Sequence, residues 1–193
     1  ADAVHAIVGA HRSEPRPHQE TMVASIAARA APAATKADLV AAARAATEAG
    51  DEDIALRRAA LAVLGLDAAG APTEEALIET IAAGFPAAAI DALRAAGWPY
   101  EVMQEVIAPR RTLMRRRSAG QTLTPSESDA AWRLATVLVA AERVFASRDA
   151  ALAWLLRTKL TLRGRSPAEL VASSVGTAHI LSVLRRVDAG DYL

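Results

Sequence analysis

The chain has 193 residues, of which 49 are alanine and 4% are aromatic, and it contains no cysteine. Disulfides, thiolate chemistry and zinc–thiolate sites are therefore excluded. Helix formers dominate and no sustained alternation of β-branched and aromatic residues is present, so the composition predicts an all-α protein with thin, alanine-lined helix contacts. Because no apolar run approaches the roughly 20 residues of a membrane span and no signal-peptide pattern opens the chain, we expect a soluble, cytoplasmic protein without a membrane partner.

Charge is distributed unevenly along the chain although the net charge is zero. Residues 1–97 carry a net charge of −5 and residues 98–193 a net charge of +5. This asymmetry predicts that the second half faces something anionic. The large apolar side chains, among them Phe85, Trp98 and Trp154, nearly all follow residue 75, so the main core is expected there.

The first 72 residues predict an Ala-rich helical N-terminal extension. Helices are expected over 18–31, from 36 to about 49 with an end at Gly50, and from 51 to Gly65. The stretch 67–72 has the composition of a linker. Since these helices bring few large side chains to bury, we expect residues 1–72 to contact the rest of the chain only slightly.

Residues 73–146 predict a helix-turn-helix domain, and residues 147–193 a small helical domain. Short helices are expected over 74–83, 86–96, 100–107 and 109–120, before a long helix that begins at a capping box, Thr124 to Glu127, and ends near Ala146. Short helices joined by tight turns, with the basic one last, are typical of the DNA-binding motif. Further helices are expected over 148–157 and 174–189, with a second capping box from Ser166 to Glu169.

Five arginines between Pro109 and Arg117 are the strongest chemical signal in the chain. Arginine suits bidentate contact with phosphate and with guanine edges. A recognition helix uses its N-terminal residues on base edges, which predicts base contacts by Arg110, Arg111 and Thr112, and phosphate contacts by Arg115 and Arg116. The alternative is a solvated basic face. Because no aromatic residue is interleaved with the arginines, duplex DNA is favoured over single-stranded nucleic acid.

Catalytic patterns are missing from the sequence. No Ser/His/Asp arrangement, glycine-rich phosphate loop or metal cluster has a supporting context, so neither enzymatic activity nor a cofactor or metal is expected. The last six residues, Asp188 to Leu193, are either a frayed end or an acidic plug for a basic pocket on a partner.

Five motifs in sequence order give residues 75–193 a resemblance to the Xre/MbcA/ParS-type antitoxins, which are partners of RES-domain toxins. Any one motif is weak, but five in order are specific. They are Pro109, Arg111-Thr112-Leu113 and Arg115-Arg116; Leu123 with Glu127-Ser128-Asp129 and Arg133-Leu134-Ala135; Val144-Phe145 with Ala151 and Trp154-Leu155; Gly164 to Leu170; and Gly176 with Leu184 and Gly190.

The resemblance implies an antitoxin of a type II toxin–antitoxin pair. Its Xre-like helix-turn-helix domain would repress its own operon by binding operator DNA, and its C-terminal domain would cover the active site of an NAD-degrading RES-type toxin. Toxin contact is expected at Arg163, Gly164 and Arg165, and along the tail at Asp188, Gly190, Asp191, Tyr192 and Leu193. A homo-oligomer within a toxin–antitoxin hetero-oligomer is expected.

Two other interpretations stay open at this point. One is a stand-alone helix-turn-helix repressor whose C-terminal helices mediate dimerisation. The other is an adaptor that keeps the fold and has lost DNA binding. A toxin gene in the neighbouring reading frame would favour the antitoxin over both.

Overall fold

The computed structural model describes residues 36–67 and 73–190. The chain divides into two compact units, Ala1–Ala45 and Ala46–Leu193. The helix predicted over 18–31 lies outside the described residues. The helices are α2 (Lys36–Val63), α3 (Glu74–Ala83), α4 (Ala88–Ala95), α5 (Tyr100–Val106), α6 (Arg110–Ser118), α7 (Pro125–Phe145), α8 (Arg148–Leu156), α9 (Pro167–Leu170) and α10 (Ser174–Asp188), with a short 3-10 helix, η1 (Leu160–Leu162).

The prediction of an all-α fold is confirmed over the described residues. They contain no strand, and two isolated bridges, Pro86 to Thr122 and Lys159 to Arg165, are the β-type pairings between them. No helix in the described ranges combines the length and the apolar character that crossing a membrane requires.

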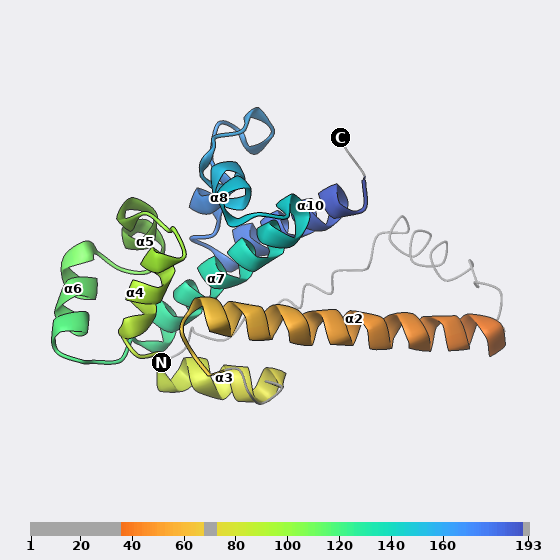
Figure 1. Cartoon of the computed structure of the whole chain (residues 1–193), viewed down its shortest axis with the longest axis horizontal. Coiled ribbons are helices and arrows are strands. Elements are labelled where there is room, and N and C mark those ends of the chain that lie inside the picture. The colour runs from red at the N-terminus through yellow and green to blue at the C-terminus, as the bar shows by residue number, and fades with distance from the viewer. Residues whose placement is uncertain (1–35, 68–72, 191–193) are drawn as a thin grey trace, which may run out of the picture. The chain divides into compact units, whose positions relative to one another are not determined.

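Helix α7 is the central element of the second unit. Its 21 residues pack against α3, α4 and α5, and also against α8 and α10. Figure 1 shows α4 and α5 beside one half of α7, with α6 beyond them, and α8 and α10 beside the other half. The buried face of α7 includes Leu134, Val137, Leu138 and Ala141, and Phe85, Trp98, Met103, Leu113, Leu155, Ile180 and Leu184 complete one continuous core around it.

The predicted helix starts follow from local capping chemistry. Thr124 accepts a hydrogen bond from the backbone N–H of Glu127, whose carboxylate accepts the N–H of Thr124 in return. Ser166 and Glu169 form the second capping box. Each reciprocal pair satisfies backbone N–H groups that a helix start leaves without an intrahelical partner.

Helix α2 differs from the prediction at Gly50. The sequence predicts one helix ending there and another starting at residue 51, but α2 continues through this position from Lys36 to Val63. A single glycine inside a helix costs only about 1 kcal/mol relative to alanine, so it need not end the helix.

The end of α2 also differs from the expected slight contact of residues 1–72. Ala60, Leu61 and Leu64 are buried, and Leu56, Val63 and Leu66 pack against the core. The division between the units falls at Ala45, so residues 46–66 belong with the helix-turn-helix part of the chain. A few well-placed leucines are sufficient to bury the end of a helix in which alanine is the commonest residue.

Two of the family-like motifs act as joints between elements. The Oγ of Ser128, fully buried in α7, accepts the backbone N–H of Phe85 at 2.8 Å and so ties the α3–α4 turn to α7. Asp129 pairs with Arg133 at 3.0 Å, and Arg133 donates in turn to the carbonyl oxygen of Val171, just after α9. Gly176, in the first turn of α10, lies close to the carbonyl oxygen of Leu170. A Cβ atom at position 176 would lie only 2.0 Å from that oxygen, so the position requires glycine.

Candidate functional site

The arginine helix α6 is anchored by one residue and otherwise lies on the surface. Leu113 is fully buried, and the three-residue turn 107–109 joins α6 to α5. With about 100° of rotation per residue, Arg111 and Arg115 lie on the side of α6 opposite Leu113, and both are exposed. Thr112 is half-buried beside them. The short helix pair therefore presents a basic face, as the helix-turn-helix pattern predicts.

Among the arginines of α6, Arg111 is the one most available to a ligand. Within the described part of the chain it has no carboxylate or ring partner. Arg115 donates from Nη1 to Oε1 of Gln121 at 3.1 Å, a neutral partner that leaves its charge uncompensated. Both guanidinium groups are free to meet an anion.

Arg116, for which a phosphate contact is predicted, takes part in an ion pair within the fold. Its side chain is 18% exposed, and its Nε lies 2.9 Å from a carboxylate oxygen of Glu127. Its Nη1 also donates to the carbonyl oxygen of Thr122 at 3.2 Å. Arg116 therefore links α6 to the capping box of α7. Arg117 pairs with Asp91 of α4 at 2.8 Å.

Tyr100, which the sequence pattern did not indicate, organises a second pair of arginines. The guanidinium carbon of Arg94 lies 4.1 Å from the centroid of its ring and that of Arg110 lies 4.8 Å from it. The Tyr100 hydroxyl donates to Sδ of Met114 on α6 at 3.5 Å. The ring thus holds Arg94 of α4 and Arg110 of α6 on one surface through cation–π contacts. The only sequence signal for this arrangement is an aromatic residue at the start of the first helix of the motif.

The loop between α8 and α9 contains Arg163, Gly164 and Arg165, the predicted toxin-contact residues. Lys159 and Arg165 pair through their backbones, and η1 lies between them. Arg163 and Gly164 both have positive φ, 56° and 76°. All three predicted residues are exposed, and the structure brings them together as one surface.

Lys159 is fixed at the base of this loop. Its ammonium lies 4.7 Å from the centroid of the Trp154 ring. Burial, and then the charge of Arg157, lower the pKa of Lys159. Arg165 is the better neutralised of the loop's arginines, since its Nε lies 3.7 Å from a Glu169 carboxylate oxygen.

Half of the predicted six-residue acidic tail, namely Asp191, Tyr192 and Leu193, lies outside the described residues. Asp188 ends α10 and lines a hollow of about 130 Å³ together with Glu52 and Asp53 of α2 and Arg143 and Arg185. Gly190 follows at φ 79°. The structure therefore associates Asp188 with the α2–α7–α10 hollow, whereas Arg163 to Arg165 lie in the α8–α9 loop.

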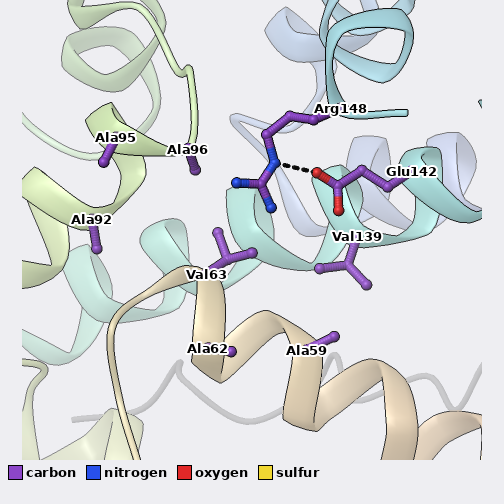
Figure 2. Close-up of a pocket in the computed structure, with 9 residues that line it drawn as sticks. All are labelled: Ala59, Ala62, Val63, Ala92, Ala95, Ala96, Val139, Glu142 and Arg148. Atoms are coloured by element: carbon purple, nitrogen blue, oxygen red, sulfur yellow. Dashed lines mark hydrogen bonds and ion pairs between the residues drawn. The ribbon is translucent and has the colours of Figure 1, made fainter. Parts of the chain in front are cut away.

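A larger hollow of about 500 Å³ lies between α2, α4 and α7 (Figure 2). Its lining is mainly alanine, with Val63 and Val139, and its two charged residues, Glu142 and Arg148, pair with each other through a short contact. This hydrogen bond raises the pKa of Arg148. The hollow follows from the predicted alanine-lined helix contacts, and the ion pair fastens the start of α8 to α7. The described residues contain no cluster of His, Cys, Asp and Glu that would hold a metal ion.

Comparison with known families agrees with this division of surfaces. Residues 76–135 match the family model of the antitoxin Xre-like helix-turn-helix domain. Residues 140–190 match that of the antitoxin Xre/MbcA/ParS C-terminal toxin-binding domain. The basic face on α6 thus falls in the first match, and the α8–α9 loop in the second.

Curated relatives extend over both regions. An "Antitoxin Xre" of Pseudomonas putida is 32% identical over 107 residues, which are 55% of this chain and 67% of that protein. An "Antitoxin Xre" of Yersinia enterocolitica is 29% identical over 117 residues, which are 59% of this chain and 79% of that protein. With a match to the Xre-like helix-turn-helix domain, a match to the toxin-binding domain and curated relatives of the same name, the chain belongs to the Xre antitoxin family.

Proposed function

We propose that this chain is the antitoxin of a type II pair, that it neutralises an NAD-degrading RES-type toxin by covering its active site, and that it represses its own operon. The observation that carries this proposal is that one chain presents a basic helix with two uncompensated arginines, Arg111 and Arg115, and, beyond a shared α7, a domain of the toxin-binding family. The proposed partners are the toxin and operator duplex DNA. The chain itself would act as a homo-oligomer within a larger complex with the toxin.

The DNA-binding surface consists of Arg110, Arg111, Thr112 and Arg115, with Arg94 beside them. Arg111 at the start of α6 is in the position from which a recognition helix reaches base edges. Arg115, one turn further, and the pair held by Tyr100 are suited to phosphates, which fix position without reading sequence. Arg116 supports this surface through Glu127 and is the member least free to reach DNA itself.

The toxin-facing surface is proposed at the α8–α9 loop, with Asp188, Gly190, Asp191, Tyr192 and Leu193 as a second contact. The loop is basic, whereas the tail carries carboxylates. A cleft that binds the pyrophosphate of NAD offers cationic groups, which the tail carboxylates would satisfy, while Arg163 and Arg165 would meet acidic groups at its rim. Asp188 ends α10 whereas the arginines lie in the α8–α9 loop, so the proposed partner would contact two elements of the domain.

Cellular NAD measures the function directly. The RES-type toxin from the adjacent reading frame is induced alone, with this chain, and with an Arg111→Ala/Arg115→Ala double variant. We expect NAD to fall with toxin alone and to be preserved by both versions of the chain, because the double variant leaves the toxin-binding domain intact. If the chain is expressed at the toxin's level and NAD still falls, the stand-alone repressor with C-terminal dimerisation becomes the better interpretation.

The two exposed arginines of α6 should affect DNA binding differently. Arg111→Ala should cost about 1–3 kcal/mol on the operator and relax specificity at one base pair, because it removes a base contact. Arg115→Ala should weaken binding to all duplexes and lower the slope of log K against log salt by about 0.9, since it removes one phosphate contact. Gel-shift titrations at several salt concentrations measure both effects.

Arg186→Ala is the matched control for these titrations. Arg186 is an exposed arginine on α10, in the toxin-binding match, so its loss changes the net charge equally without touching α6. If operator affinity falls as much for Arg186→Ala as for Arg111→Ala, then DNA affinity depends only on the total charge of the chain. That result would rule out α6 as the DNA-binding helix.

A further inference from the structure

Leu160 is the most exposed of the large apolar side chains in the described residues. It is 95% exposed, against 79% for Val175 and 59% for Ile78. A single exposed leucine is ordinary on a protein surface and by itself indicates nothing. What distinguishes Leu160 is the way in which its loop is built and charged.

The loop backbone around Leu160 is closed by its own hydrogen bonds. The carbonyl oxygen of Lys159 accepts the N–H groups of Leu162 and Gly164, each at 3.0 Å, and the N–H of Lys159 donates to the carbonyl oxygen of Arg165 at 3.0 Å. The carbonyl oxygen of Leu160 itself accepts the N–H of Arg163, also at 3.0 Å. The tip is therefore a hydrogen-bonded turn, and Leu160 is exposed on it.

The flanking side chains are fixed as well. Lys159 lies over the Trp154 ring, and Leu162 packs against the core. Arg163 adopts the left-handed conformation, at φ 56° and ψ 40°. Residues other than glycine rarely adopt this conformation, and the surrounding structure must stabilise it. Figure 1 shows this loop standing away from the helices beyond α8. The fold thus exposes an apolar side chain to water on a loop that its own backbone hydrogen bonds close.

The charges around Leu160 are of one sign. Arg157, Lys159, Arg163 and Arg165 all lie within five residues of it, and Glu169 compensates only Arg165. A partner surface complementary to this loop has an apolar pocket with carboxylates around its rim. A preorganised anchor loses little conformational entropy on binding, and a rim of matched charge speeds association.

We propose that Leu160 is an apolar anchor that inserts into an acidic-rimmed pocket on the toxin, and that Arg157, Arg163 and Arg165 form its charged collar. The inference rests on the proposed function, because it places the toxin on the α8–α9 loop. It adds to that function a residue outside the predicted set and the chemistry of the surface that receives it. The occupant is a protein, since duplex DNA would match the collar but offers no buried apolar pocket for the leucine.

Binding of the purified full chain to the RES-type toxin from the adjacent reading frame tests this assignment. Leu160→Asp should lower the affinity of the complex by at least 100-fold and Leu160→Ala by about tenfold. Most of this change should appear as a faster dissociation rate. Arg163→Ala should instead slow association and flatten its dependence on salt. Because Leu160 is exposed, the melting temperature of the free chain should be unchanged in each variant.

Ile78→Asp provides the matched control, because it places the same carboxylate at an exposed apolar position on α3, in the helix-turn-helix match. If the unaltered chain binds the toxin and Leu160→Asp binds it equally well, the anchor is refuted while the proposed function stands. If the unaltered chain does not bind, both fail. A Leu160→Asp variant that loses affinity for operator DNA instead would assign the loop to nucleic acid and would also overturn the proposal.

Discussion

Deleting residues 1–72 is expected to unfold the helix-turn-helix and toxin-binding regions rather than to leave them intact. The deletion removes Leu61 and Leu64, both buried, and Leu56, Val63 and Leu66, which pack against the core. Truncating a buried leucine to alanine costs about 2–5 kcal/mol, so losing several such side chains approaches the 5–15 kcal/mol that a typical domain has in total. Circular dichroism during heating should show a drop of many degrees or no cooperative transition.

A shorter deletion, ending at Ala45, is the control. Among the residues whose side chains the structure describes, all that pack in the core lie after it, so we expect the melting temperature to stay close to that of the full chain. Leu64→Ala in the full chain is the point variant to compare, with an expected cost of about 2–5 kcal/mol. Equal stability of the full chain and of residues 73–193 would show that the end of α2 contributes nothing to the core.

Gly84→Ala is expected to be among the most destabilising single substitutions in the chain. Gly84 has φ 89° and ψ 130°, a region that other residues rarely adopt, and a Cβ there would lie 2.2 Å from the carbonyl oxygen of Leu123. That carbonyl belongs to a backbone already fixed, since the N–H of Leu123 donates to the carbonyl oxygen of Phe85 at 2.8 Å. Backbone strain and collision together should cost about 3 kcal/mol or more, which is roughly 6–12 °C in melting temperature for a chain of this size.

Gly120→Ala separates the two contributions to this cost. Gly120 also has positive φ, 61°, but a Cβ there meets nothing within 4 Å. Strain alone should cost about 1–2 kcal/mol at this position. Thermal melts in which Gly84→Ala and Gly120→Ala lose the same stability would mean that the α3–α4 turn can move away from Leu123.

Features encoded by neighbouring residues were predictable from the sequence. Thr124, Ser147 and Ser166 each cap a helix through a backbone N–H three residues away, so the pattern is visible over a short window. The same holds for Gly84 and Gly190, which follow α3 and α10. The local rule that a glycine ends a helix failed at Gly50. Helix α2 continues through this position, because one glycine in a helix costs only about 1 kcal/mol relative to alanine.

Features that depend on distant residues were not predictable. From its neighbours in sequence, Arg116 is one more basic residue of the arginine helix. Its ion pair with Glu127 forms only because the fold brings α6 and the start of α7 together. Burial of the end of α2 depends on Leu64 meeting the core formed by later helices. The pairing of Arg94 and Arg110 around Tyr100 likewise requires three elements to be placed together. The specific DNA and toxin contacts stay predictions for the experiments above.

The continuity of α7 constrains how such a protein can evolve. The helix-turn-helix match ends at residue 135 and the toxin-binding match begins at residue 140, so the boundary between the two functions lies inside one helix. Adding or losing one residue there rotates everything beyond it by about 100° and shifts it by about 1.5 Å, which separates the two halves of the shared core. Recombination that exchanges operator specificity between relatives must therefore join α7 in register. New pairings of operator and toxin are expected to arise by surface substitution more often than by crossover.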